Sequence, residues 1–240
     1  MRYFKYIIIF ILAFTSLNAK KATIPYTIIN KKLNYELEFK NIPAGKGYII
    51  INQDSLYNKP VMKLTSEIKT NKYLDLFYKI RNKITIYMND KDLSLVKVIN
   101  KINEGGYKNN HHASVDIKKM RLINSKGEQA IKDKVYSPLS VIFSIREKLL
   151  NLEDKFYYKT YSNGKQRDIN ISLIGKEKIK TAFGEFNTVV LNPTANDKKS
   201  VFKNNGDMKV WYTDDQHKIP IKIEIKIKYG SIVLLLNRIS

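Results

Sequence analysis

The sequence predicts a mainly β protein: one curved antiparallel sheet, or a half-open barrel, with one principal helix packed on its apolar face. Three observations support this fold class. Apolar and polar residues alternate along most of the 240-residue chain, turn residues separate these runs, and one segment shows a helical spacing instead. With 43% hydrophobic and 27% charged residues, the composition is that of a globular chain and excludes a disordered or collagen-like one.

The first 19 residues have the layout of a signal peptide. Arg2 and Lys5 precede an apolar run over 6–14, and a short polar stretch then ends at Ala19. The run is shorter than the roughly 20 apolar residues that span a bilayer, so we expect cleavage near Ala19 and no integral membrane span afterwards. Residues 20–240 are then a single exported β-rich domain, expected in the periplasm. Because the chain has no cysteine, core burial alone must hold it together.

The first strand is predicted at 33–39, where apolar residues at odd positions alternate with polar ones. Pro43, Gly45 and Gly47 then predict a turn over 42–47 before a strand at 48–51. Further strands are expected over 62–68, 84–88 and 95–102, whereas 73–81 is ambiguous. Gly105-Gly106 predicts another hairpin, and a loose arm with Ala113 and Val115 follows it. His111 and His112 are expected in a solvated loop of this arm.

The principal helix is predicted from Pro138 to Leu150. Ser137 offers a capping hydroxyl, and Pro138 stands at the first helical position, where its missing N–H costs nothing. Apolar residues then recur near helical spacing and form a stripe broad enough to be buried against a sheet: Leu139, Ile142, Phe143, Ile145, Leu149 and Leu150.

The second half returns to alternation. Asn163-Gly164 predicts a tight hairpin between strands at 156–161 and 167–174. A turn over 181–186 leads to strands at 188–191 and 208–213. Asp214 to His217 forms a four-residue turn, after which isoleucines alternate with polar residues over 219–228, and Gly230-Ser231 turns the chain into the last strand.

Four stretches carry a family resemblance. They are 33–45 with an aliphatic-x-Ala-Gly motif, 136–146 with Pro-Leu-Ser and a terminal arginine, 176–186 with Lys-Glu-x-Ile-Lys-Thr-x-x-Gly-x-Phe, and 211–221 with Trp-x-Thr-Asp-Asp and Ile-Pro, which 230–232 closes. Over nearly all of the mature chain, the sequence resembles the bacterial exported family known as domain of unknown function 3108. Val135, Tyr136 and Ser137 stand where a Gln-Asp pair is expected, so no role is transferred there.

The resemblance implies an exported β-rich domain similar to the Lol-type lipoprotein carriers, in which a half-open sheet wraps around a hydrophobic cavity. It implies no activity. Residue types alone also give no convincing catalytic constellation, and we expect no catalytic group, metal or cofactor.

Four residues are candidates for a ligand site or for a structural role: Arg146, Trp211, Asp214 and Asp215. Asp214, Asp215 and His217 form a tight acidic and imidazole cluster, but aspartates are also common turn residues because their carboxylates accept nearby backbone N–H bonds. Arg146 lies on the predicted helix. If buried, it needs a carboxylate or a carbonyl, and Asp214 or Asp215 is a plausible partner. Trp211, the only tryptophan, is either a core residue or a shelf for a ligand.

The formal net charge of +21 favours an anionic partner. Lipid, lipopolysaccharide and acidic glycans fit an exported protein, whereas no recognition helix points to nucleic acid. A coding bias is the preferred explanation of the charge, because the lysines are scattered among many isoleucines and asparagines.

We therefore expect a non-enzymatic periplasmic binding or carrier protein for an apolar or anionic envelope ligand. The alternative is a structural or assembly factor of the cell envelope that binds a protein partner by a sheet edge or a lysine-rich face. A hydrolase would need Asp214, Asp215 and His217 to converge on one cleft. An outer-membrane barrel also gives alternating strands, but the amphipathic helix and the lack of a terminal aromatic residue argue against it.

Overall fold

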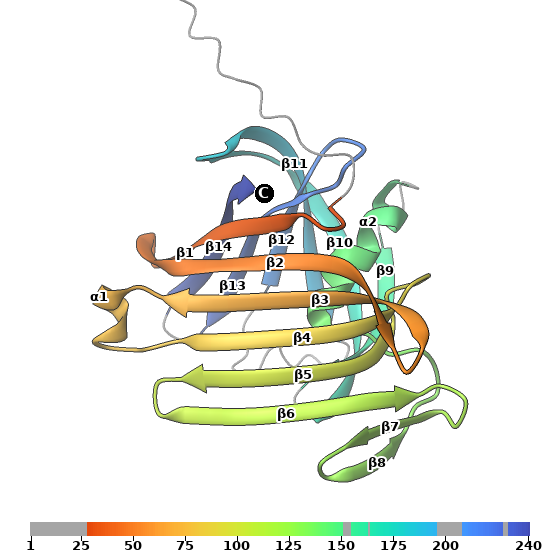
Figure 1. Ribbon diagram of the computed structural model, residues 1–240. Helices are drawn as coiled ribbons and strands as arrows, with labels where there is room; N and C mark the ends of the chain where they lie inside the picture. The colour runs from red at the N-terminus through yellow and green to blue at the C-terminus, as the bar shows by residue number, and fades with distance from the viewer. Residues whose placement is uncertain (1–27, 151–154, 163, 196–207, 228–229) are drawn as a thin grey trace, which may run out of the picture.

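The computed structural model describes residues 28–150, 155–162, 164–195, 208–227 and 230–240, so the predicted leader and Asn163 of the predicted hairpin lie outside the described residues. Within these ranges, fourteen strands form one antiparallel sheet in the order β8-β7-β6-β5-β4-β3-β2-β1-β14-β13-β12-β11-β10-β9. Two meanders therefore meet at the β1–β14 pair. The sheet curves around α2 without closing, as Figure 1 shows, which confirms the predicted fold class.

The first meander contains β1 (Lys32–Phe39), β2 (Ile42–Leu56), β3 (Lys59–Thr70), β4 (Arg81–Asn89), β5 (Leu95–Glu104), β6 (Tyr107–Asp116), β7 (Arg121–Asn124) and β8 (Gly127–Ala130). The second contains β9 (Lys155–Ser162), β10 (Lys165–Thr181), β11 (Gly184–Ala195), β12 (Met208–Thr213), β13 (Pro220–Ile227) and β14 (Gly230–Ile239). The helices are α1 (Lys72–Asp75), in the region left ambiguous by the sequence, and α2 (Pro138–Leu150).

The first hairpin turns earlier than the sequence predicted. Lys40 and Asn41 have φ angles of 51° and 63°, so these two residues form the turn, and positions 42–47 belong to β2. Gly45 instead allows β2 and β3 to approach each other closely, because a Cβ at this position would lie 2.1 Å from the carbonyl oxygen of Lys69 on β3. The prediction of a turn at 42–47 was therefore wrong: the glycines allow the strands to pack closely where the sheet bends.

The helix α2 has the predicted bounds, but Ser137 does not cap it with its hydroxyl in the way the sequence suggested. The Ser140 hydroxyl instead accepts from the backbone N–H of Ser137 and donates to its carbonyl oxygen, at 3.1 and 2.9 Å. No helix in the described part of the chain is long and apolar enough to cross a membrane.

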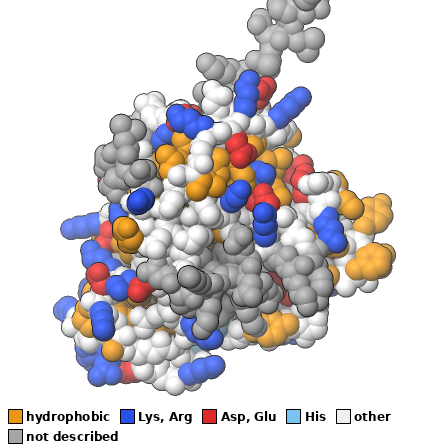
Figure 2. All heavy atoms as spheres, turned by 180° about the vertical axis from the view of Figure 1, so that it is seen from behind, with side chains coloured by type: hydrophobic (Ala, Val, Ile, Leu, Met, Phe, Trp, Pro, Cys, Tyr) orange, Lys and Arg blue, Asp and Glu red, His pale blue; other side chains and the backbone are white. Residues whose placement is uncertain are grey.

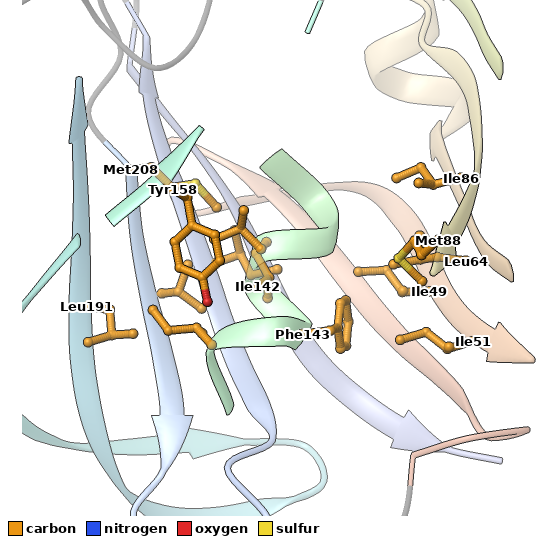
Figure 3. Packing of buried hydrophobic residues seen from close by; sticks show 14 of the residues in the cluster. Ile49, Ile51, Leu64, Ile86, Met88, Ile142, Phe143, Tyr158, Leu191 and Met208 are labelled. Atoms are coloured by element: carbon orange, nitrogen blue, oxygen red, sulfur yellow. The ribbon is translucent and has the colours of Figure 1, made fainter. Parts of the chain in front are cut away.

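The core lies between α2 and the inner face of the sheet. Figure 3 shows Phe143 pointing toward Ile49, Ile51 and Met88 on the first meander, while Ile142 lies on the side of Leu191 and Met208 on the second. Because both meanders contribute to one buried cluster, the helix joins the two halves of the sheet.

Hydrogen bonds tie the two ends of the open sheet to each other. The Tyr161 hydroxyl on β9 lies 3.1 Å from Asn124 Nδ2 on β7 and 2.9 Å from His111 Nε2 on β6. Tyr136 covers the β9 edge, because its N–H donates to the carbonyl of Lys159 at 2.8 Å. The prediction that His111 and His112 lie in a solvated loop was wrong, since both belong to β6 and His111 is half-buried.

Candidate functional site

Asp215 organises the turn between β12 and β13. Its Oδ1 accepts from the Thr213 hydroxyl at 2.7 Å and from the backbone N–H of His217 at 2.8 Å. The Thr213 hydroxyl in turn accepts from the N–H of Ile219 at 2.9 Å. The carboxylate of Asp215 therefore stabilises the chain reversal, in the manner of an aspartate turn.

Asp214 is engaged by a different set of groups. Its carboxylate lies 2.7 Å from Lys176 Nζ on β10 and 3.3 Å from Lys218 Nζ. These ammonium groups, Lys176 first, hold the pKa of Asp214 below its ordinary value and outweigh the opposing effect of burial. Asp214 and Asp215 thus have separate partners, and the described residues contain no group of three side chains suited to hold a metal ion.

Arg146 extends from α2 to the same turn. Its Nε donates to the carbonyl oxygens of His217 at 3.1 Å and of Lys218 at 3.0 Å. The guanidinium thus donates to two carbonyl oxygens and not to the carboxylates of Asp214 or Asp215. The negative charge of Asp215 is nevertheless close enough to favour the protonated form of Arg146. Burial lowers the pKa of Arg146 and is the largest influence on it. The contact links the helix to the β12–β13 turn.

Trp211 is almost fully buried but is not part of the cluster around α2. Its indole Nε1 donates to Glu177 Oε2 at 2.9 Å, and Lys222 Nζ lies 4.2 Å from the ring centroid. The neighbouring Tyr212 belongs to the inner cluster, where its hydroxyl donates to the carbonyl of Ile142 at 2.9 Å. Trp211 therefore packs outside that cluster and offers little surface to a ligand.

The interior between α2 and the second meander is filled by the protein's own side chains. A residual apolar cavity of about 20 Å³ remains there, bordered by Ile142, Ile145, Leu191, Met208 and Tyr212 among others. This volume is enough for about one water molecule, and an acyl chain does not fit.

A broad groove lies over strands β14, β1, β2 and β3. It is a groove of about 720 Å³, hereafter the β1–β3 groove, and its border includes Lys32, Lys46, Lys69 and Arg238, with Tyr48 between them. Lys32 Nζ lies 4.0 Å from the centroid of the Tyr48 ring. The groove thus combines cations with an aromatic surface.

Cations face one another across the strands at this groove. Lys46 on β2 stands opposite Lys69 on β3, and Lys69 stands opposite Arg81 on β4. Like charges directly opposite each other destabilise a sheet. Lys69 is relieved by Glu67 at 3.5 Å, whereas Lys46 makes no ion pair with any other described residue. On its other side Lys46 stands opposite Glu36 on β1, and the groove as a whole is bordered by four cations and three carboxylates, a small positive excess that favours an anion.

Three acidic residues, Glu36, Glu38 and Glu67, also border the groove, and two of them have partners there. Glu67 lies 2.8 Å from Lys83, whose hydrogen bond is the main cause of the lowered pKa of Glu67. Glu36 accepts from Asn237 Nδ2 at 2.7 Å.

A second groove, of about 400 Å³, continues the basic surface over β3 to β5. It is bordered by Lys63, Thr65, Lys83, Thr85, Tyr87, Ile99 and Lys101. Lys83 and Lys101 are directly opposite each other on β4 and β5.

Sequence reasoning did not find these grooves. The signal was present, because Lys46, Lys69 and Lys83 each occupy a polar position of an alternating strand, but only the strand register shows that they are neighbours.

The curved, open antiparallel sheet around α2 is typical of barrel-like β folds. The basic β1–β3 groove is an additional feature of this sheet. The family described as Protein of unknown function (DUF3108) matches residues 34–237, so the chain belongs to this family. A sequence search of curated proteins gave no match. Among solved structures, the chain is similar to a "Beta-barrel-like Protein of Domain of Unknown Function DUF1849 from Brucella abortus", with a TM-score of 0.59 and 9% identity over 89% of this chain and 98% of the other. At this identity the similarity concerns the fold alone.

Proposed function

We propose that this protein is a non-enzymatic binding protein of the bacterial cell envelope, and that the β1–β3 groove holds an anionic ligand. The ligand chemistry is a phosphate or carboxylate carried by a polar body, as in a lipid headgroup or an acidic glycan. The observation that carries the proposal is the groove itself: about 720 Å³, bordered by Lys32, Lys46, Lys69 and Arg238. Its volume is in the range of small-molecule sites.

The anionic ligand is better supported than the apolar one. A carrier of the Lol type needs a hollow interior, but the pocket between α2 and the second meander has a volume of only about 20 Å³. An acyl chain would enter only if α2 moved away from the sheet. That motion would expose Ile142 and Phe143, each worth roughly 2–3 kcal/mol when buried.

The groove is suited to a ligand that carries hydroxyl groups as well as charge. The ring of Tyr48 lies on its border and suits the face of a sugar, while the amide nitrogens of Asn34, Asn71 and Asn237 beside it already donate to protein groups. Glu67 holds Lys83 and Glu36 holds the amide of Asn237, and Glu36 also stands opposite Lys46 on the neighbouring strand.

The location follows from the leader predicted over 1–19, and we propose export to the periplasm. An envelope ligand rich in phosphate or uronic acid is then within reach of the groove. Osmotic-shock fractionation tests the location separately from the ligand: release of the protein without detergent supports it, and retention in the cytoplasm contradicts it.

Isothermal titration calorimetry with trigalacturonate and with glycerol phosphate tests the ligand chemistry, and uncharged maltotriose is the neutral control. We expect at least one anionic probe to bind and maltotriose to give no heat. A Lys46→Glu, Lys69→Glu double variant should bind that probe at least about tenfold more weakly, because two attractive charges become repulsive.

The matched control variant is Lys118→Glu, Lys119→Glu, which makes the same change of charge at two exposed residues outside the groove. It should bind like the wild type. Absence of binding by both anionic probes, or equal affinity of the groove variant and the control, would refute the proposal. The probe that binds identifies the source: a glycan for trigalacturonate, a headgroup for glycerol phosphate.

An assembly role through a sheet edge has less support in the structure. Tyr136 bridges to Thr160 and thereby covers part of β9, one of the two edges of the sheet. At the other edge, the carbonyl of Ala130 on β8 accepts from Gln166 Nε2 at 3.0 Å. Cross-linking in cells followed by pull-down separates the two roles, because a stoichiometric protein partner would support assembly.

A further inference from the structure

A short apolar projection joins β3 to β4. It consists of residues 72–79 and contains α1, and we call it the α1 tip. Tyr73, Leu76 and Phe77 are 70%, 81% and 85% exposed there, and Tyr78 is 48% exposed. In Figure 1, α1 lies at the left margin. Figure 2 is turned by 180°, and hydrophobic side chains project at its right margin, which is the same side of the molecule. Contiguous exposed apolar side chains of this size mark an interaction site.

The backbone of the α1 tip is fixed before any partner binds. The side chain of Asn71 accepts from the N–H groups of Tyr73 and Leu74 at 3.1 and 2.9 Å, and its amide donates to the carbonyl of Pro43 on β2 at 2.8 Å. Asp75 accepts from both terminal nitrogens of Arg81, with Nη1 at 3.0 Å. The tip is therefore tied to β2 and β4.

The inward side chains of the tip are separate from the exposed ones. Leu74 packs against the main hydrophobic cluster, and the Tyr78 ring lies so close to Gly105 that a Cβ there would be 2.9 Å from it. Leu76 and Phe77 make no comparable contribution to the fold, since more than four-fifths of each is exposed. Packing within the fold therefore does not explain why these two positions are apolar.

Cations surround the exposed apolar side chains. Lys72 and Lys79 are the first and last residues of the tip, and Lys69 and Lys46 stand at its base in the cross-strand row described above. The single acidic residue of the tip, Asp75, is neutralised by Arg81. Aromatic and leucine side chains ringed by lysines are complementary to an anionic bilayer, whose headgroups attract the lysines while its interface takes up the apolar groups.

We propose that the α1 tip docks the protein on an anionic lipid bilayer, with Leu76 and Phe77 entering the interfacial region and the lysines contacting headgroup phosphates. The tip is convex, and a bilayer accepts a small convex apolar projection without a matching pocket. Lys46 and Lys69 stand at the base of the tip and also border the β1–β3 groove, so the two sites share cations, whereas Leu76 and Phe77 belong to the tip alone and their variant tests docking separately.

Flotation with lipid vesicles tests the proposal. The N-terminus of each preparation is first determined by mass spectrometry, so that all variants start at the same residue. The wild type should float with vesicles of phosphatidylcholine and phosphatidylglycerol, and much less with phosphatidylcholine alone. The Leu76→Ser, Phe77→Ser variant should partition at least about tenfold more weakly, because two apolar side chains leave the interface.

The matched control variant is Tyr57→Asn, Tyr157→Ser. It also removes two large exposed side chains, which are 74% and 70% exposed, at positions outside the tip. It should float like the wild type. A Lys72→Glu, Lys79→Glu variant should lose the preference for phosphatidylglycerol while keeping the fold.

A Phe77→Trp variant gives a direct readout. The emission of the introduced indole should shift to the blue with anionic vesicles and should be quenched by brominated lipid, whereas the wild type, with buried Trp211 alone, supplies the background.

No flotation of the wild type, equal flotation of the tip variant and the control, or an unshifted emission of the Phe77→Trp variant would each overturn the proposal. A tip-dependent dimer in light scattering without flotation would overturn it as well, in favour of a second copy of this chain. Trigalacturonate or glycerol phosphate binding that persists in the tip variant shows that a failed docking leaves the groove intact.

Discussion

The Nε atom of Arg146 lies 3.1 Å from the carbonyl oxygen of His217, and this contact attaches α2 to the turn between β12 and β13. Replacing Arg146 by Met keeps the apolar stem of the side chain but removes the guanidinium that donates to the carbonyls of His217 and Lys218. Since hydrogen bonds to a charged group are worth roughly 1.5–3 kcal/mol each, we expect the free energy of unfolding to fall by about 2–3 kcal/mol.

Urea denaturation followed by circular dichroism measures this loss, and Glu147→Gln, an exposed change on the next residue of the same helix, should leave the midpoint unchanged. Equal midpoints for the Arg146 variant and the wild type would show that the link is dispensable.

Tyr161 should hold the two ends of the open sheet together. A Tyr161→Phe variant leaves Asn124 Nδ2 without the hydroxyl that now lies 3.1 Å away, and the loss of a buried partner costs about 1–3 kcal/mol. Hydrogen exchange should accelerate in β7 and β9. Tyr157→Phe, on the same strand but 70% exposed, is the control. Unchanged exchange in the Tyr161 variant would mean that this contact does not limit opening.

Asp214 should contribute stability at neutral pH and lose it in acid. Because Lys176 and Lys218 lower its pKa in the folded state, the folded protein favours the ionised carboxylate. The contribution is complete above about pH 4, the unfolded value, and disappears as the pH falls through the lower folded pKa. Asp214→Asn should therefore be less stable than the wild type at neutral pH, with a difference that shrinks in acid.

Urea midpoints measured across this pH range give the comparison for Asp214. Asp90→Asn, in an exposed turn, removes one surface carboxylate in the same way and is measured alongside. A difference for Asp214→Asn that grows in acid would reverse the sign of the proposed effect.

Gly45 should be intolerant of any side chain. A Cβ there would lie 2.1 Å from the carbonyl oxygen of Lys69 and 2.8 Å from the Cα of Thr70, and both are backbone atoms that a rotamer change cannot move. Gly45→Ala should cost at least about 1–3 kcal/mol and should weaken binding at the β1–β3 groove. Gly106→Ala is the control, because nothing lies within 4 Å of its added Cβ. Equal thermal midpoints for the two variants would contradict the close approach.

Alternation along the strands was enough to predict the fold class. Apolar residues recur every second position in β1 and β13 and at helical spacing in α2. Each pattern reflects which side of the element faces the core, and it can be recognised from neighbouring residues alone. The first turn was misplaced because Pro43 and the glycines of β2 are typical turn residues, while Lys40 and Asn41 carry a weaker signal. Close packing against Lys69 requires Gly45, and a sequence does not show that neighbour.

The candidate residues were located on the correct elements, but their partners were not predictable. Arg146 lies on α2 and near the Asp214–Asp215 turn, as the sequence suggested, yet it binds the carbonyls of that turn. Carbonyl acceptors carry no sequence signature. The grooves depend on register across several strands, so the proximity of Lys46 and Lys69, 23 residues apart in the printed sequence, emerges only from the folded sheet.

The most direct test of anion binding at the groove is a nitrogen–proton correlation spectrum recorded during titration with trigalacturonate and with glycerol phosphate. Binding at the β1–β3 groove predicts that the amide signals of Gly45, Gly47 and Tyr48 shift in proportion to occupancy with at least one probe, while those of Lys118 and Lys119 stay in place. Shifts confined to residues outside the groove, or none at saturating concentrations of both probes, would contradict the assignment of this groove as the binding site.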